Sequence, residues 1–184
     1  MKRNLPQRKN IRLESECYTQ TGYYFITICI KNRLNILGKI YECRGGYQPS
    51  AKIELTKFGR LVEKYLKEIP NVYRNVKIDE YVIMPNHIHL ILILESNNEF
   101  DISTIIGQFK RKVSKEIKCK IGQKLFYDHI IRNDKEYYKI KEYIQINVER
   151  WEEDKYWRTA DSRPYNIINQ LLFRRKKCQR EITI

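Results

Sequence analysis

Two hydrophobic segments joined by a very short link constrain the fold of this chain most. Val76–Ile83 and His87–Leu94 are rich in aliphatic and β-branched residues, and Pro85 and Asn86 make a tight connection between them. A link this short implies that the two strands form an antiparallel hairpin. The second segment, HIHLILIL, is apolar apart from its two histidines, so it predicts a buried strand.

The remaining elements follow from periodicity and from turn residues. Residues 31–55 contain several glycines and Pro49, and so predict turns or a short hairpin. Thr56 can cap a helix that ends near Pro70, and Asn133 can cap a last helix that runs to about Glu149. Asn133 and Glu136 form a capping-box-like pair at its start. The other expected elements are a strand at Tyr23–Ile30, a helix over roughly 102–117 and a short strand at about Asp128–Arg132.

This order, β-α-β-β-α-β with a terminal helix, predicts an α+β fold. It is the ferredoxin-like (RRM-like) arrangement, an antiparallel sheet with helices on one face, plus a C-terminal helix. In the 184-residue chain we expect one domain over residues 21–157, a basic lead-in over 1–20 and a basic tail over 158–184. Proteins of unrelated function share this topology, so it does not by itself indicate a function.

The net charge of the chain restricts the kinds of partner that it is expected to bind. Lys plus Arg total 36 against 22 for Asp plus Glu, a formal net charge of +14. Such an excess favours nucleic acid, although an ordinary basic cytosolic protein can share it. The five cysteines contain no CxxC pair, which favours free thiols in a reducing, cytoplasmic setting. The longest apolar stretch, Ile88–Leu94, is too short to cross a bilayer, so no membrane partner is expected.

His87 and His89 are the strongest local signal of chemistry. Alternate side chains of a strand point to the same face, so both imidazoles should project together from one side of the sheet. Two adjacent imidazoles provide half of a divalent-metal site. The alternative is a pair of hydrogen-bonded structural histidines, which an isolated HxH motif more often represents.

Tyr143 and Asn147 are the second signal. They lie four residues apart on the last predicted helix, and therefore on one face. A phenol is a poor nucleophile at neutral pH because its pKa is near 10, but it can attack a phosphodiester whose charge a metal neutralises. The amide oxygen of Asn147 could complete the metal's ligand set. Ordinary packing is the alternative, because the chain has 14 tyrosines.

Basic and aromatic side chains could contact a nucleic acid directly. The candidate phosphate contacts are Lys110 and Arg111 on the second long helix, Arg132 at the end of the last expected strand, and Arg174 and Arg175 in the tail. Aromatic residues could stack unpaired bases. The aromatic candidates are Phe126, Tyr127, Tyr137, Tyr138, Trp151 and Trp157. A solvated basic face with ordinary core aromatics would look the same in sequence.

Several segments together resemble one protein family. The run YVIMPNHIH at 81–89 resembles the HUH signature of REP-associated tyrosine transposases, relatives of the single-tyrosine transposases of small bacterial insertion sequences. FYDHIIRN at 126–133 and EYIQIN at 142–147 resemble the family's segment before the catalytic helix and its tyrosine motif. YFITIC at 24–29, followed by Asn32 and Arg33, is similar to its first strand. The resemblance covers roughly residues 10–157.

The resemblance implies a role for each matching position. His87 and His89 would bind Mg²⁺ or Mn²⁺, with Asn147 as the third ligand, and Tyr143 would be the nucleophile of a single-tyrosine HUH transposase domain. Cleavage of single-stranded DNA would leave a 5′-phosphotyrosine link and a free 3′-hydroxyl, and attack by another 3′-hydroxyl would rejoin strands. The implied partners are DNA hairpins like those of repetitive extragenic palindromes or insertion-sequence ends.

Some positions depart from the family's pattern. Val148 follows Asn147 where the family usually has proline, and GQKL at 122–125 stands where a Trp-Gln-Arg run is frequent. Substrate choice is therefore expected to differ if this segment guides DNA. His129 matches a family position, but the pattern leaves packing and DNA contact equally open, so it is not assigned to the metal.

Other functions and two assembly states remain open from the sequence. A non-catalytic single-stranded nucleic-acid-binding module would explain the charge, but not a histidine pair facing Tyr143 and Asn147. A phosphodiesterase acting on small molecules or RNA would form no covalent intermediate. If Tyr143 reaches the histidines of its own chain a monomer suffices, and otherwise a homodimer is required.

Overall fold

A four-stranded antiparallel sheet lies at the centre of the structure, which is a computed structural model that describes residues 20–43, 50–95, 100–120 and 122–153. Its strands are β1 (Gly22–Cys29), β4 (Val76–Ile83), β5 (His87–Leu94) and β6 (Tyr127–Ile131). They are hydrogen-bonded in the order β4-β5-β1-β6, so the first strand and the histidine-bearing strand are the two inner ones. This order is that of the ferredoxin-like split βαβ arrangement, and it confirms the predicted fold class.

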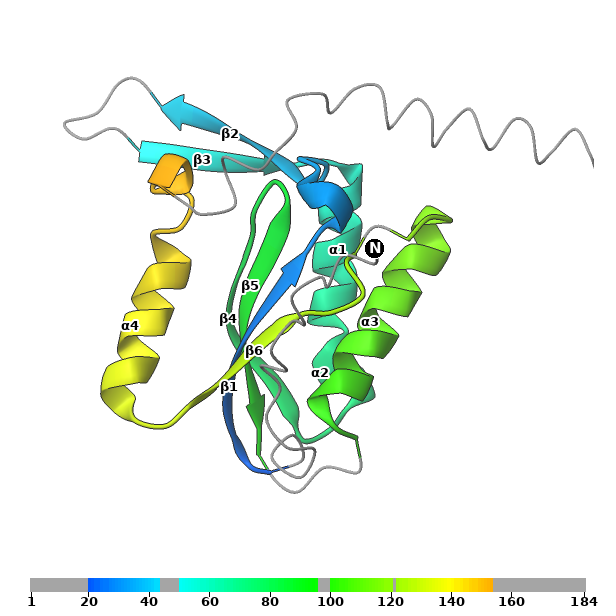
Figure 1. The fold of residues 1–184 in the computed structure, drawn as a ribbon, viewed down its shortest axis with the longest axis vertical. Helices are drawn as coiled ribbons and strands as arrows, with labels where there is room; N and C mark the ends of the chain where they lie inside the picture. Colours follow the sequence, from blue (N-terminus) through cyan, green and yellow to red (C-terminus); the bar gives the residue numbers. More distant parts are fainter. Residues whose placement is uncertain (1–19, 44–49, 96–99, 121, 154–184) are drawn as a thin grey trace, which may run out of the picture.

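The segment between β1 and the first helix forms the predicted short hairpin. Its strands, β2 (Gly38–Cys43) and β3 (Ser50–Leu55), pair with each other and not with the central sheet. In Figure 1 the hairpin lies across one end of the sheet, beyond the β4–β5 turn.

Two helices, α1 (Lys57–Lys67) and α3 (Ile102–Ile117), cover one face of the sheet (Figure 1). Thr56 Oγ1 accepts from the backbone N–H of Gly59 and so caps α1, as predicted. Pro70 was expected to end this helix, but it lies in the first turn of a further short helix, α2 (Ile69–Val72), where its missing N–H costs no hydrogen bond. The main core lies between these helices and the sheet. It includes Ile26, Ile28, Leu66, Ile88, Leu90, Leu92, Ile105 and Ile106.

The last helix, α4 (Asp134–Gln145), covers part of the opposite face of the sheet (Figure 1). Its apolar contact is small and centres on Ile91, Ile131 and Ile144. The helix ends at Gln145 rather than near Glu149, because the backbone N–H of Asn147 reaches the carbonyl of Ile144 in a tightened turn. A short 3-10 helix at Trp151–Glu153 follows.

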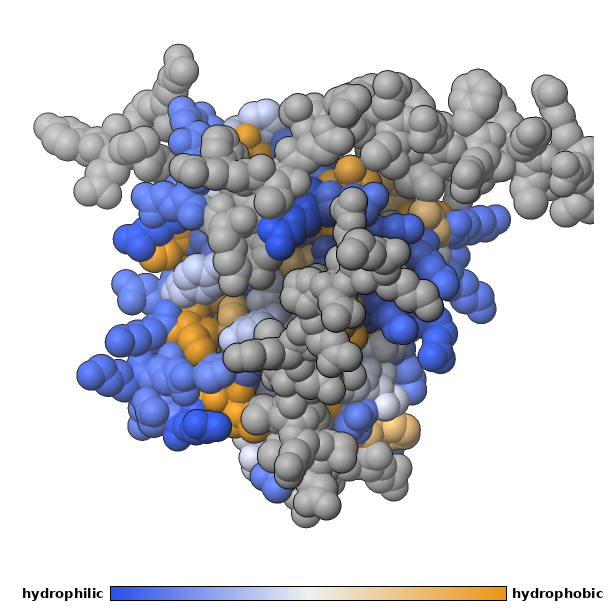
Figure 2. Space-filling model, viewed as in Figure 1, coloured by the Kyte–Doolittle hydropathy of each residue, from blue (hydrophilic) through white to orange (hydrophobic). Residues whose placement is uncertain are grey.

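The surface reflects this layering. In Figure 2 hydrophilic residues line the outer sides of the molecule, and hydrophobic residues reach the surface between α4 and the strands. In the described segments, no helix combines the length and the apolar composition that a bilayer crossing needs.

Candidate active site

The two histidines of β5 project together from the face of the sheet that α4 partly covers. The centroids of the His87 and His89 rings lie 4.5 Å apart, and both side chains are buried. Ile88, between them, points into the main core on the other face. The prediction that both imidazoles share one face is therefore confirmed.

Each imidazole is held through its Nδ1 atom. His89 Nδ1 lies 2.8 Å from Thr27 Oγ1, on the neighbouring residue of β1, and His87 Nδ1 lies 2.8 Å from Asn86 Oδ1. An amide oxygen only accepts hydrogen bonds, so Nδ1 of His87 carries the proton and its Nε2 has a lone pair. Contacts of this kind fix the ring orientation and tautomer of metal-binding histidines.

Aromatic rings flank the pair on both sides. Phe25 stacks on His89 with ring centroids 5.2 Å apart, and Trp151 stacks on His87 at 6.0 Å. The two stacked rings limit how far the imidazoles can tilt. Trp151 was one of the aromatics expected to stack bases, but its side chain is buried against His87.

Tyr143 of α4 reaches this pair within the same chain. Its hydroxyl oxygen lies 3.3 Å from His89 Nε2, and its ring meets Phe25 and His89 at steep angles. The side chain is 39% exposed. The phenol is therefore beside the imidazoles and open to a substrate, rather than packed in the interior.

Asn147 is buried one helical turn beyond Tyr143. It is 3% exposed, and within the described residues its Oδ1 has no hydrogen-bond partner. It lies midway in sequence between Tyr143 and Trp151, which contact His89 and His87 respectively. A buried, unsatisfied amide oxygen at such a position is suited to a cation.

The candidate donor set consists of two imidazole nitrogens and one amide oxygen. Across the described residues, no group of three or more His, Cys, Asp and Glu side chains could hold a metal. A metal at the histidine pair would therefore need a ligand of another type, and the oxygen of Asn147 is of the kind that Mg²⁺ and Mn²⁺ accept.

A β-bulge in β4 positions α4 over the site. The register of β4 against β5 shifts between Ile78 and Glu80, so Asp79 is an extra residue in the strand. Bulges re-aim side chains, and here both Asp79 and Glu80 contact α4. Asp79 Oδ2 accepts from Tyr137 Oη at 2.7 Å and from Lys141 Nζ at 3.3 Å.

These polar contacts run along one stripe of α4. Glu80 Oε2 accepts from Gln145 Nε2 at 2.9 Å, one turn beyond Lys141. The hydrogen bond to Asp79 raises the pKa of Tyr137, and the hydrogen bonds to Tyr137 and Asp79 raise the pKa of Lys141. The helix that carries Tyr143 is thus fixed to β4 largely by hydrogen bonds.

Glu136 joins the start of α4 to β6. Asn133 Oδ1 accepts from the Glu136 N–H at 2.9 Å, as the predicted cap requires. The Glu136 carboxylate does not complete a capping box but accepts from the Arg132 N–H at 2.9 Å and contacts His129 Nε2 at 2.7 Å. These two contacts lower the pKa of Glu136. His129 therefore lies in a contact between strand and helix, apart from the histidine pair.

The predicted phosphate contacts have different environments. The Lys110 ammonium donates to the carbonyls of Gln123 and Lys124, and so holds the segment that leads to β6. Arg111 and Arg132 are exposed. Arg174, Arg175 and Trp157 lie outside the described residues.

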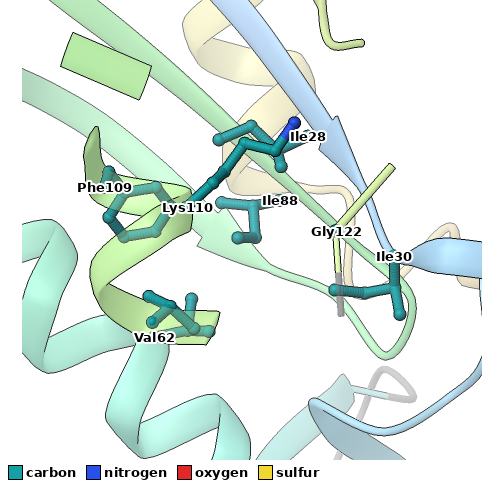
Figure 3. Close-up of a pocket in the computed structure, with 8 residues that line it drawn as sticks. Ile28, Ile30, Val62, Ile88, Phe109, Lys110 and Gly122 are labelled. Carbon is teal, nitrogen blue, oxygen red and sulfur yellow. The ribbon is translucent and has the colours of Figure 1, made fainter. Parts of the chain in front are cut away.

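A small apolar pocket lies near Lys110, on the other side of the sheet (Figure 3). It is lined by Ile28, Ile30, Val62, Ile88, Phe109, Lys110, Val113 and Gly122. Since Ile88 alternates with the histidines along β5, this pocket belongs to the core under α1 and α3 and not to the candidate site.

Comparison with known proteins places the chain in a family. Residues 18–147 match the family model of IS200-like transposases. The chain belongs to the IS200-like transposase family. The resemblance found in the sequence is confirmed at this level, and all four candidate residues of the IS200-like transposase lie within the matched region.

Individual relatives agree with this assignment. An uncharacterised protein of Haemophilus influenzae strain Rd is 34% identical over 173 residues, which cover 80% of this chain and 92% of that protein. A REP-associated tyrosine transposase of Escherichia coli K12 is 26% identical over 131 residues, 71% of this chain and 68% of that one.

A solved structure has the same fold. It is a REP-associated tyrosine transposase bound to a REP hairpin, and it matches with a TM-score of 0.60 at 22% identity, over 82% of this chain and 76% of that chain. Together the family and its named relatives assign this IS200-like transposase a transposase-type function on DNA.

Proposed function

We propose that this IS200-like transposase cleaves and rejoins single-stranded, hairpin-bearing DNA through a 5′-phosphotyrosine intermediate on Tyr143. The observation that carries the proposal is the 3.3 Å approach of the Tyr143 hydroxyl to His89 Nε2, beside a second histidine, within one chain. With 39% of its side chain exposed, Tyr143 can reach a substrate while its hydroxyl lies beside the two oriented imidazoles.

His87, His89 and Asn147 are the proposed ligands of a Mg²⁺ or Mn²⁺ ion. When bound, the ion would polarise the scissile phosphate and offset its negative charge. Thr27 and Asn86 hold the two imidazoles through Nδ1. Phe25 stacks on His89 and Trp151 stacks on His87.

The reaction exchanges one phosphate ester for another. The Tyr143 oxygen attacks phosphorus and loses its proton, and the bond from phosphorus to the 3′ oxygen breaks. That oxygen leaves as a 3′-hydroxyl, and the 5′-phosphate stays on Tyr143. Attack by a second 3′-hydroxyl on this ester restores the phenol and joins the strands. No external energy source is required, because the ester linkage is conserved.

The proposed partner is a DNA hairpin with a single-stranded flank. Support comes from the net charge of +14 and from the relative whose structure contains a REP hairpin. Because Tyr143 meets histidines of its own chain, one chain supplies the nucleophile and the two imidazoles. A monomer is therefore sufficient for the proposed chemistry.

Covalent capture tests the nucleophile. The probe is a pool of oligonucleotides with a hairpin, randomised single-stranded flanks and a 3′-end fluorophore, incubated with the protein and Mg²⁺ or Mn²⁺. A labelled band on a denaturing protein gel reports the adduct. Tyr143→Phe should remove the band, whereas Tyr138→Phe, an exposed tyrosine on the same helix, should leave it.

Metal dependence is tested with the same probe. EDTA, His87→Ala and His89→Ala should each abolish the adduct, and added Mg²⁺ or Mn²⁺ should restore it only after EDTA. An adduct that persists in Tyr143→Phe would refute the assigned nucleophile. Hairpin binding without any adduct would instead indicate the non-catalytic binding module.

A further inference from the structure

A group of aromatic side chains surrounds the open side of the candidate site. Phe25 lies at its centre, stacked on His89. The ring of Tyr127 on the edge strand β6 stands steeply to Phe25, with centroids 6.4 Å apart, and the Tyr143 ring does so from α4 at 6.3 Å. Tyr127 is thus separated from the proposed nucleophile by a single ring.

This arrangement follows from the sheet register. Thr27 of β1 pairs with His89 on one side and with Tyr127 on the other, so the three side chains form a row across one face. Among the described residues, α4 packs mainly on β4 and β5, so its backbone covers the β1–β6 side of this face less.

Tyr127 has no evident role in stabilising the fold. Its side chain is 46% exposed, and it belongs to neither hydrophobic core cluster. Within the described residues its one aromatic neighbour is Phe25. A large ring kept exposed on an edge strand beside a proposed active site has an available face for a ligand.

The charge around Tyr127 suits a polyanion. Lys124 and Arg132 are exposed at the two ends of the segment that carries it. The Glu136 carboxylate, which contacts His129 of the same strand, also accepts from the Arg132 N–H. An unpaired base combines a flat π face with a negatively charged backbone, whereas paired bases in a duplex are already stacked.

We propose that Tyr127, supported by Phe25, is a stacking site for an unpaired base of single-stranded DNA next to the phosphate that Tyr143 attacks. This inference rests on the proposed function for the position of the phosphate. The stacking site itself requires only that single-stranded DNA binds this face.

Binding measurements with two probes test the stacking site. The full chain carrying Tyr143→Phe is titrated in EDTA, at fixed ionic strength, with a fluorescent oligothymidylate and with an abasic oligonucleotide of the same length. Adding Tyr127→Ala should weaken oligothymidylate binding about 5- to 150-fold, because loss of one base–aromatic stack costs about 1–3 kcal/mol. Binding of the abasic strand, which has no bases to stack, should change less than about 2-fold.

Matched variants separate stacking from other causes. Tyr127→Phe keeps the ring and should bind like the parent, and so should Tyr41→Ala, an exposed tyrosine on β2. Equal losses for both probes, or an unchanged affinity for oligothymidylate, would overturn the proposal. Because EDTA and Tyr143→Phe prevent cleavage, the outcome is independent of the adduct assay. A base-dependent loss without any adduct in that assay would retain the stacking site and reject the transposition chemistry.

Discussion

Replacing Thr27 by valine should weaken metal binding at the histidine pair while leaving the packing almost unchanged. Valine has nearly the shape of threonine but lacks the hydroxyl that lies 2.8 Å from His89 Nδ1. Thr27 is 2% exposed and His89 is 1% exposed, so water cannot replace the lost contact. The hydrogen bond that orients the imidazole and sets its tautomer would then be lost.

The size of the effect follows from this burial. Leaving a buried polar group unsatisfied costs about 1–3 kcal/mol. At about 1.4 kcal/mol per tenfold, that is roughly a 5- to 150-fold change in an equilibrium constant. Loss of a hydrogen-bond partner of a metal-binding histidine typically costs about 10- to 100-fold in metal affinity. We therefore expect the Kd for Mn²⁺ to rise about 10- to 100-fold in Thr27→Val.

The assay is a titration of Mn²⁺ followed by the electron paramagnetic resonance signal of the free ion. Thr27→Ser retains the hydroxyl and serves as the matched control, with Mn²⁺ affinity close to that of the wild type. Thermal unfolding without metal checks that both variants fold. A Mn²⁺ affinity in Thr27→Val within twofold of the wild type, or an equal loss in Thr27→Ser, would refute the argument that Thr27 orients a metal ligand.

Three further predictions concern the rest of the structure. Asp79→Ala removes the acceptor of two hydrogen bonds from α4. A loss of about 1 kcal/mol should accelerate amide hydrogen exchange in that helix about 5-fold. An exchange rate within twofold of the wild type would contradict the role of Asp79 in holding α4. The pKa of Glu136 is lowered in the folded state, so its stabilising contribution is present at neutral pH and is lost as the pH falls below its ordinary value of 4.5. The free energy of unfolding should fall less steeply in this acid range for Glu136→Gln, and parallel acid profiles would argue against the contact. An added Cβ at Gly59 would overlap the carbonyl oxygen of Leu37, so Gly59→Ala should lower the free energy of unfolding by about 3 kcal/mol. Gly107 has open space around it, so Gly107→Ala should raise the free energy of unfolding by up to about 1 kcal/mol. Thermal or denaturant unfolding measures both.

The sheet and the histidine pair were predictable because every second side chain of a β-strand points to the same face. His87 and His89 share a face whichever partner strand lies beside them, and the short link at Pro85 and Asn86 permits one pairing with β4. Helix α3 was equally clear, since its apolar residues fall on one stripe. These are local signals, and tertiary contacts did not override them.

The partners of the histidines could not be predicted, because they depend on register between distant strands. Thr27 lies 62 residues before His89, and only the pairing of β1 with β5 brings them together. A polar residue inside the apolar YYFITICI strand was the one available signal. The hydrogen bond from Lys110 to the Gln123 carbonyl was also not predicted, because a lysine on a basic helix face is expected to be solvated.

The end of the last helix was predicted too late for a related reason. Continued helical spacing through Asn147 suggested a helix to about Glu149, yet the chain tightens after Gln145. Asn147 and Trp151 are buried in the turns that follow. Helix propensity could not reveal this, because the contact between Trp151 and His87 is long-range.

Because Asp79 is an extra residue in β4, the contacts that hold α4 do not depend on how β4 packs against the main core. Val76 and Ile78 before Asp79, and Tyr81 and Ile83 after it, all face the main core. Removing this one residue would leave a regular strand whose apolar side chains keep their faces. A lineage could therefore gain or lose the carboxylate that holds its nucleophile-bearing helix through a single codon insertion or deletion, without rebuilding the hydrophobic interior.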